Sequence, residues 1–475
     1  MSSTVLSAPQ LTIDGQFAGS NSSLAVVNPA TAEVFVEVPS ATAAQLDHAV
    51  AAANRAAPAW RARSLTERQD LVRRYAAVIR ANMEELARLL TLEQGKPLSR
   101  ARGEIGSGLA YVESFCAMDL PVEVARDDEN ERLELRRVPV GVVAAITAWN
   151  YPQLLSLWKI GPALVAGNPV IVKPSPYTPV STLRAGELAQ QVLPPGVLQV
   201  LAGGDDLGRS IATHPGIHKI TFTGSVRAGK SIMGAAAGTL KRLTLELGGN
   251  DPGIVLDDAD PAAIAADLYA GGMSNCGQVC AGLKRLYVPA SRAGEYADAL
   301  ADVAANVVVG NGLDEGVDMG PVQNGAQLAR VKGLLADAQA AGGEVFFRGE
   351  APEGPGYWHP ATLVRGLTDG IGLVAEEQFG PVLPLLTYED VDEVVTRANA
   401  SPFGLGASVW SSDVERATGV AERLEAGSVW VNQHPALSPE APFGGLKQSG
   451  LGVEAARDGL LAYTDISVLR VKRSS

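Results

Sequence analysis

Cysteine is scarce in this chain of 475 residues, which contains only Cys116, Cys276 and Cys280. Three cysteines cannot build the disulfide framework of a small secreted module, and such low usage is typical of a reducing compartment. The opening segment MSSTVLSAPQ has no basic residues ahead of an apolar run, so we expect no secretory signal. These features predict a cytoplasmic protein.

Positive charge and long apolar runs are also in short supply. Lys and Arg number 39 against 52 Asp and Glu, which gives a net charge of −13. A surface of this sign repels phosphate backbones and anionic lipid headgroups, so neither nucleic acid nor a membrane is an expected partner. The one long uncharged segment, residues 138–158, contains Asn150 and Pro152, which would interrupt a spanning helix. It predicts a buried strand followed by a turn.

The length is about three times that of a typical ~150-residue domain, and the residue pattern changes once along the chain. Alanine-rich helical stretches come first, with a capping box at Ser64 and Glu67. From Val138 onward, apolar strands alternate with helical patterns; they lie near 138–147, 169–172, 197–201, 218–222, 253–256, 285–290, 381–388, 407–410 and 428–432. Unbroken apolar strands between helices favour parallel sheets covered on both faces. The fold class is therefore α/β, with two doubly wound domains.

Two segments alternate differently and are more polar. Residues 131–138 and 462–471 have the pattern of exposed strands. Strands of this kind at the margin of a domain pair with each other or with a second subunit. A small β element for oligomerisation is therefore expected in addition to the two domains.

The glycine fingerprint G-x-G-x-x-G of many dinucleotide-binding domains does not occur. The nearest substitute is the run KITFTGSVRAGKSI, in which a strand enters the turn Thr223-Gly224-Ser225 before a helical pattern. Glycine allows the backbone to approach a ligand, and a helix start favours phosphate. Taken alone, the run favours an ordinary strand-to-helix turn over a phosphate site.

Three further residues are candidates for chemistry. Cys280 is flanked by small residues, which leave room for a substrate, although an inert buried thiol would look the same. Glu246 ends an apolar strand and is either a general base with a raised pKa or a solvated residue at a strand end. Asn150 is either a turn former or a donor to an oxyanion. Cys116 is assigned to the core, and Cys276 with Cys280 does not make a metal site.

In their order and spacing, eight segments resemble the aldehyde dehydrogenase superfamily. They are AWNYP (148–152), WKIGPALVAGN (158–168), IVKPS (171–175), FTGS (222–225), ELGGN (246–250), GQVC (277–280), EEQFGPV (376–382) and PFGGLKQSG (442–450). Each is weak by itself, but together they cover most of the chain from about residue 148 to residue 450. On these motifs the chain is identified as a member of the superfamily.

The resemblance implies oxidation of an aldehyde to a carboxylic acid with NAD, or with NADP as the alternative. The Cys280 thiolate would add to the aldehyde, and the Asn150 side chain and the Cys280 backbone amide would hold the oxyanion of the thiohemiacetal. Loss of hydride would leave a thioester, which water activated by Glu246 would hydrolyse. Relatives that pass the acyl group to coenzyme A generally lack this glutamate. A non-catalytic dinucleotide-binding relative is the competing hypothesis.

The resemblance also implies a set of cofactor-binding residues. Lys173 would reach the adenosine ribose, Gly204 and the Gly224-Ser225 turn the diphosphate, and Glu377 the nicotinamide ribose. The full set is Trp149, Lys173, Ser175, Gly204, Phe222, Thr223, Gly224, Ser225, Leu247, Glu377 and Phe379. No metal is expected, and the only small-molecule partner expected besides the cofactor is the aldehyde.

The expected domains follow from the same comparison. Residues 1–120 and 139–246 would form the cofactor-binding domain and residues 247–445 the catalytic domain. Residues 121–138 would supply the first oligomerisation strands, and residues 446–475 a return segment and tail, in a homodimer or homotetramer.

Three points depart from the family pattern or stay open. Pro176 stands where many NAD-preferring members have a glutamate that repels a 2′-phosphate. Cys276, if one helical turn from Cys280, would be placed for a disulfide under oxidation. Tyr151 and Trp158 either line an apolar substrate tunnel or belong to the core, and the substrate itself is not readable.

Overall fold

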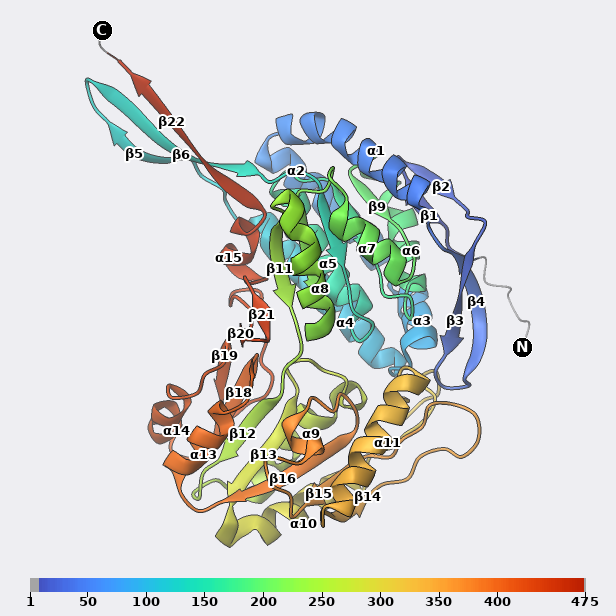
Figure 1. Cartoon of the computed structure of the whole chain (residues 1–475), viewed down its shortest axis with the longest axis vertical. Coiled ribbons are helices and arrows are strands. Elements are labelled where there is room, and N and C mark those ends of the chain that lie inside the picture. The colour runs from blue at the N-terminus through green and yellow to red at the C-terminus, as the bar shows by residue number, and fades with distance from the viewer. Residues whose placement is uncertain (1–7, 474–475) are drawn as a thin grey trace.

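Two β-sheets, each with helices on both faces, form the two lobes of the molecule, and a narrow three-stranded arm projects from the first lobe (Figure 1). The computed structural model describes residues 8–473. The expectation of no secretory signal concerns a segment that lies largely outside these residues. The α/β class with two doubly wound sheets is confirmed by the strand order described next.

The first lobe is built on an eight-stranded sheet with the order β2-β1-β9-β8-β7-β10-β11-β21. Its five central strands run parallel, whereas β1, β2 and β21 are antiparallel additions. The bounds are β1 Leu11–Ile13, β2 Gln16–Ala18, β7 Val143–Ile146, β8 Val170–Lys173, β9 Leu198–Val200, β10 Lys219–Thr223, β11 Arg242–Glu246 and β21 Gly450–Leu451. The strand order reverses between β7 and β10, which is where doubly wound sheets bind ligands.

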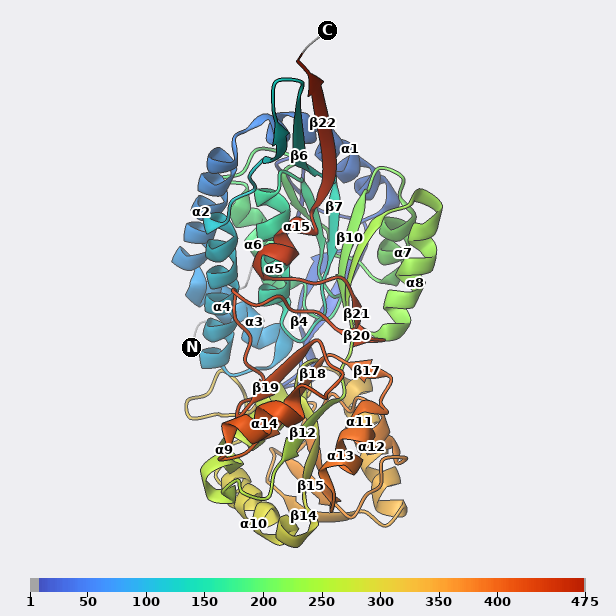
Figure 2. The ribbon, with the colours of Figure 1, turned by 90° about the vertical axis from the view of Figure 1, so that its left-hand side faces the viewer.

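Helices cover both faces of this sheet. Figure 2 shows α2 to α6 on one side of the strands and α7 and α8 on the other. The bounds are α1 Ala43–Ala62, α2 Leu65–Ala81, α3 Met83–Gln94, α4 Leu98–Ala117, α5 Pro152–Val165, α6 Val180–Ala189, α7 Asp205–Thr213, α8 Val226–Ala236 and α15 Ala456–Leu461. The capping box predicted at Ser64 is present at the start of α2, where such a cap contributes about 1 kcal/mol. Cys116 is fully buried in this core, as predicted.

The second lobe contains a seven-stranded sheet with the order β14-β15-β16-β13-β12-β18-β19, all parallel except β14. The strands are β12 Asp251–Val255, β13 Leu283–Pro289, β14 Glu344–Arg348, β15 Thr362–Arg365, β16 Val382–Tyr388, β18 Gly406–Trp410 and β19 Ser428–Val431. The helices are α9 Pro261–Met273, α10 Ala293–Ala304, α11 Gly325–Ala340, α12 Gly372–Ala375, α13 Val391–Asn399 and α14 Val414–Ala421. Ile254 packs into the core beneath α11 to α14, whereas its neighbour Val255 packs beneath α9 and α10. This alternation explains why these strands are apolar at every position.

The arm is the three-stranded antiparallel sheet β22-β6-β5, formed by β5 Glu123–Asp127, β6 Glu131–Pro139 and β22 Thr464–Lys472. The two polar strands predicted at the margins of the domains therefore pair with each other, from Thr464 opposite Pro139 to Lys472 opposite Glu131. The arm leaves the body of the molecule and carries the C-terminal strand to its tip (Figures 1 and 2).

The prediction for the start of the chain was incomplete. Four strands, β1, β2, β3 Ser23–Asn28 and β4 Glu33–Pro39, precede the first helix. They are short, and β3 and β4 form a separate hairpin with several exposed positions, so their apolar pattern is weak. Two further short strands, β17 Phe403–Gly404 and β20 Leu446–Lys447, pair with each other between the lobes and were also not predicted.

The uncharged segment 138–158 has the predicted form. It contains the buried strand β7 and a turn at Asn150 and Tyr151, and α5 starts at Pro152. Within residues 8–473, no helix combines the length and the apolar character needed to cross a bilayer.

Candidate active site

The predicted residues of the first lobe follow the carboxyl ends of its parallel strands. These ends meet at one edge of the sheet, which faces the second lobe. Trp149 and Asn150 follow β7, Lys173 ends β8, Gly204 follows β9, Thr223 ends β10 and Glu246 ends β11. The second lobe adds Cys280 from the loop before β13 and Glu377 from the loop before β16.

A cleft of about 560 Å³ at this edge gathers most of them. Its predicted lining residues are Trp149, Asn150, Thr223, Gly224, Ser225, Leu247, Cys280, Glu377 and Phe379. Lys173, Ser175, Gly204, Phe222 and Glu246 are not among the lining residues, although all five belong to the same edge of the sheet. The cleft also receives Gln327, Arg330, Pro402 and Phe403, which were not predicted.

Cys280 lies in a loop that follows a 3₁₀ turn over Ser274–Gly277. Asn275 and Cys276 are left-handed in this turn, and Gly277 also has a positive φ of 68°. A Cβ at Gly277 would come within 2.1 Å of the Gly380 carbonyl oxygen, so glycine is required there. Cys276 is therefore not one helical turn from Cys280, because the segment is not an α-helix, and its side chain packs in the core of the second lobe. The geometric basis for the disulfide hypothesis was wrong.

The Cys280 thiol is partly exposed, and its surroundings disfavour the thiolate. Burial raises its pKa to about 12, and the nearby Glu377, Asp251 and Glu246 carboxylates act in the same direction. A thiol in this state is largely neutral until a base or a bound cation lowers the cost of its charge.

Asn150 is buried and points toward the cysteine loop. Its side-chain Nδ2 donates to the Gln278 carbonyl at 3.1 Å, and its Oδ1 accepts from no group among residues 8–473. A carboxamide has two N–H donors, so the second remains for a ligand beside Cys280. The turn-forming and oxyanion roles of Asn150 are thus compatible, because the backbone makes the turn while the side chain faces the cleft.

Glu246 is buried rather than solvated at its strand end. Neither carboxylate oxygen has a hydrogen-bond partner in the described part of the chain. Burial raises the pKa of Glu246 well above its usual value, the nearby Glu454 carboxylate raises it further, and Lys159 lowers it. Lys159 Nζ lies 2.6 Å from Glu454 and 2.7 Å from the Thr223 hydroxyl, so a buried polar network adjoins Glu246.

Glu377 and Phe379 line the opposite wall. The Glu377 carboxylate accepts a 3.2 Å hydrogen bond from the Gly249 amide, and burial raises its pKa to about 7 against the opposing charge of Lys284. Phe379 meets Trp149 edge to face, with the ring centroids 5.2 Å apart. This contact crosses the cleft between the lobes.

The first lobe offers features that suit a dinucleotide. Ser225 caps α8 by accepting from the Ala228 amide, and Gly229 packs so closely on Leu247 that a Cβ would come within 2.6 Å of it. Helix α8 therefore lies close to the segment that follows β11, as phosphate-binding turns require. Lys173 is buried at the end of β8, and burial lowers its pKa to about 8. Asp205, at the start of α7, lies near the Lys173 amine, and a cation beside a helix start is suited to a phosphate or a ribose hydroxyl.

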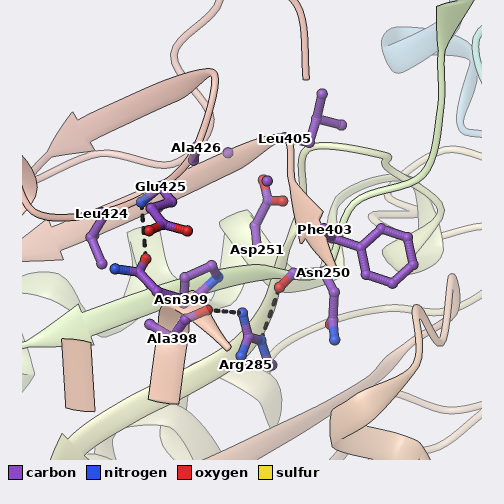
Figure 3. Close-up of a pocket in the computed structure, with 14 residues that line it drawn as sticks. Asn250, Asp251, Arg285, Ala398, Asn399, Phe403, Leu405, Leu424, Glu425 and Ala426 are labelled. Carbon is purple, nitrogen blue, oxygen red and sulfur yellow. Dashed lines mark hydrogen bonds between the residues drawn. The ribbon is translucent and has the colours of Figure 1, made fainter. Parts of the chain in front are cut away.

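A second, much smaller cavity of about 10 Å³ lies between β12, α13 and β18. Figure 3 shows Arg285 at its margin, where the guanidinium donates to the Asn250 and Ala398 carbonyls at 2.9 and 3.0 Å. This space holds about one water molecule. It is a packing feature of the second sheet and not a ligand site.

Three groups around the cleft were not among the predicted site residues: Arg330, Lys159 and Glu454. Arg330 binds the Glu376 carboxylate and the Glu377 carbonyl, at 2.9 and 3.2 Å. Lys159 and Glu454 are 295 positions apart in the chain. The nearest available signal was a buried charge within an apolar helix, since Lys159 is the one charged residue of α5.

Known proteins share both the sequence and the fold. A profile of the aldehyde dehydrogenase family matches residues 17–469. The chain is 39% identical over 473 residues to a phenylacetaldehyde dehydrogenase of Pseudomonas fluorescens, covering 96% of this chain and 94% of the relative. It is 38% identical to a 3-sulfolactaldehyde dehydrogenase of Pseudomonas putida over 464 residues, with 96% of each covered.

The fold comparison agrees. An NAD⁺ complex of an aldehyde dehydrogenase from Bacillus cereus superimposes with a TM-score of 0.96 at 34% identity, over 99% of this chain and 98% of the other. The cleft, with the Cys280 thiol and the Asn150 carboxamide at the carboxyl edge of a doubly wound sheet, lies in the region where both comparisons match. The chain therefore belongs to the aldehyde dehydrogenase family and is an NAD(P)-dependent oxidoreductase that acts on aldehydes.

Proposed function

We propose that Cys280 is the nucleophile, that Asn150 holds the oxyanion and that Glu246 activates the water of hydrolysis. The observation that carries this assignment is the cleft itself, which Cys280 and Asn150 both line while Glu246 ends the adjoining strand β11. A neutral aldehyde does not readily lose hydride, because an acylium-like carbon would result. Addition of Cys280 as the thiolate, after the thiol has lost its proton, makes this carbon tetrahedral and moves the negative charge from sulfur to oxygen.

Asn150 and the Cys280 backbone N–H would donate to that oxygen. Donors of this kind are worth about 3 kcal/mol each in a water-poor site. Bound NAD(P)⁺ supplies the acceptor for the hydride that the oxyanion expels. The product left on the enzyme is a thioester of Cys280. The Glu246 carboxylate takes a proton from the water that attacks it, the carbon–sulfur bond breaks, and the carboxylic acid and the Cys280 thiolate are released.

The division into domains is part of the same proposal. Residues 1–120 and 139–246 bind the dinucleotide, and residues 247–445 carry the nucleophile. Residues 121–138 supply the first oligomerisation strands, and residues 446–475 are a return segment and oligomerisation tail. Lys173, Ser175 and Gly204 would contact the adenosine and diphosphate parts. Glu377 would hold the nicotinamide ribose, with Phe379 and Trp149 beside it. The parallel strand ends and the helix start at Ser225 support this assignment.

A substrate and cofactor panel tests the function. Purified protein is expected to produce NADH or NADPH absorbance with at least one aldehyde among aliphatic, aromatic and semialdehyde compounds, and to release the carboxylic acid. No turnover across the panel, with dinucleotide binding retained, would favour the non-catalytic relative instead.

We propose NAD as the preferred cofactor. A substitution at Pro176 tests whether this position affects discrimination between NAD and NADP. Replacing Pro176 with glutamate places a carboxylate next to Ser175, where it would repel the 2′-phosphate of NADP. We expect kcat/KM with NADP to fall about tenfold or more, which corresponds to about 1.4 kcal/mol, while kcat/KM with NAD changes little. Pro176→Gln, which adds similar bulk without charge, is the control. Equal losses with both cofactors would exclude a specific electrostatic role for this position.

We further propose that the arm joins subunits into a homodimer or homotetramer. Ile466 and Val468 of β22 are exposed by 62% and 60%, and they lie on one face of the strand. Apolar side chains in such a projecting sheet favour contact with a second subunit. A cytoplasmic location fits the need for a free Cys280 thiol.

The double variant Ile466→Lys/Val468→Lys is expected to shift the protein to the monomer mass in size-exclusion chromatography with light scattering. Charge on that face opposes burial against a partner. Ser467→Lys, on the other face of the same strand, should leave the assembly intact. An oligomer that survives the double substitution would place the interface elsewhere.

A further inference from the structure

An ion pair outside the predicted site residues is buried beside the Asn150 turn. Lys96 Nζ lies 2.5 Å from the Glu104 carboxylate, and the two side chains are exposed by only 1% and 0%. Lys96 comes from the loop between α3 and α4, and Glu104 from the second turn of α4. Neither residue lines the cleft.

The remaining contacts of this pair go to the turn that carries Asn150. Lys96 Nζ donates to the Asn150 carbonyl at 2.9 Å and lies 3.8 Å from the centre of the Tyr151 ring. The second carboxylate oxygen of Glu104 accepts from the backbone amides of Gln153 and Leu154, at 2.8 and 3.2 Å. The pair therefore holds the turn at both ends. The Lys96 ammonium binds the Asn150 carbonyl, and the Glu104 carboxylate caps the first turn of α5.

Both halves of this clamp are needed for physical reasons. The first amides of a helix have no partner within the helix, and a carboxylate there is favoured by the helix dipole. Burying an isolated carboxylate would cost desolvation free energy, and the charge of Lys96 offsets this cost. A well-packed apolar pair is usually at least as stable as a buried ion pair, so stability alone does not account for the charges. The charged groups differ from an apolar pair in that each of their hydrogen bonds fixes the orientation of one backbone group of the turn.

The position of that backbone decides where the Asn150 amide points. Asn275 also donates to the Asn150 carbonyl, at 3.0 Å, and thereby ties the turn to the cysteine loop. With this carbonyl and the start of α5 both held, the Asn150 side chain is directed to the Gln278 carbonyl at 3.1 Å, two residues before Cys280. A shift of about 1 Å in a group of this kind costs up to about 100-fold in rate.

We infer that the Lys96–Glu104 pair is a positioning device for Asn150 and sets the geometry in which its amide meets the oxyanion on Cys280. Lys96 and Glu104 touch no reacting atom and act through the Asn150 turn. The inference rests on the proposed oxyanion role of Asn150, and the two can be tested separately.

A double-mutant cycle tests it. Asn150→Ala alone is expected to lower kcat by about 100- to 1000-fold through loss of the donor. Lys96→Met alone should lower kcat by about 10- to 100-fold. If Lys96 acts through Asn150, adding Lys96→Met to Asn150→Ala should lower kcat by less than about threefold more, because the group being positioned is already gone.

A second readout separates positioning from general damage. Alkylation of Cys280 by iodoacetamide forms no oxyanion, so its rate and the Kd of NAD should be unchanged in Lys96→Met. Because loss of one charge can unfold the protein, the neutral pair Lys96→Met/Glu104→Gln is made in parallel and is expected to show the same 10- to 100-fold loss. Lys241→Met is the matched control: it also removes a buried ammonium bonded to carbonyls, those of His214 and Ile217, at the other end of β11 from Glu246, and should leave kcat unchanged.

The outcomes are distinguishable. Wild-type kcat in both folded Lys96 variants, or the same fold-loss from Lys96→Met with and without Asn150, would overturn the positioning role. Parallel losses in alkylation rate and NAD binding would overturn it as well. A wild-type kcat in Asn150→Ala would instead refute the proposed oxyanion role, and with it the basis of the inference.

Discussion

Replacing Cys280 with alanine is expected to abolish aldehyde oxidation, with a loss in kcat on the order of 10⁵-fold. Removal of a nucleophile leaves no covalent route, and only binding and oxyanion stabilisation remain. Initial rates of NADH formation at saturating aldehyde measure the effect, and calorimetry should show that NAD still binds. Burial raises the pKa of the Cys280 thiol to about 12, so its alkylation rate in the free enzyme should rise roughly tenfold per pH unit from neutral to alkaline pH.

Cys276→Ala is the matched control for this prediction. Cys276, unlike the partly exposed Cys280, is buried, and its side chain belongs to the core of the second lobe. Its loss should reduce stability modestly and leave kcat near that of the wild type. Retained turnover in Cys280→Ala, or an equal loss in Cys276→Ala, would contradict the assignment of the nucleophile.

Glu246→Gln is expected to stop the reaction after the first hydride transfer. A general base contributes about 10²- to 10⁴-fold, so steady-state kcat should fall by about 10³-fold. Acylation does not need this base in the proposed scheme, so a rapid burst of about one NADH per active site should remain. Mass spectrometry of the quenched enzyme should then find the acyl group on Cys280.

The pH dependence follows from the raised pKa of Glu246. In the proposed scheme the working form is the carboxylate, and burial with the neighbouring Glu454 raises the pKa of the group well above its usual value. Hydrolysis in the wild type should therefore slow as the pH falls through this raised pKa, and it should speed up above it. In Glu246→Gln this dependence should disappear from the hydrolysis step.

Hydroxylamine provides the control. It attacks a thioester without help from a base, so it should restore NADH turnover in Glu246→Gln but not in Cys280→Ala. If Glu246→Gln shows no burst and no acyl adduct, Glu246 acts before hydrolysis, and the assignment of its step is wrong.

Much of the fold was predictable from local patterns. Strands that are apolar at every position, such as β8 and β12, indicated parallel sheets covered on both faces, and the strand orders confirm this. The arm was predicted because β6 and β22 alternate in a way that a buried strand does not. Strands β1 to β4 were missed, because three-residue and half-exposed strands leave little periodic signal.

The candidate site was likewise predictable in some parts and not in others. Cys280, Asn150 and the Gly224-Ser225 turn were predictable because each stands in a short motif of contiguous residues. The left-handed turn before Cys280 was not predicted, because the close approach of Gly277 to Gly380 involves a distant segment. The roles of the site residues, the domain boundaries and the subunit assembly remain predictions.

The sequence by itself determined the α/β class and the family, because these depend on composition, periodicity and contiguous motifs, and it predicted the reacting groups. Only the tertiary structure decided that Glu246 is buried with no hydrogen-bond partner among residues 8–473, that Lys96 and Glu104 hold the Asn150 turn, and that Lys159 meets Glu454. The physical reason is the same in each case. The charge state and direction of a side chain are set by groups that packing brings together across 8 to 295 positions of chain, and no local pattern records those contacts.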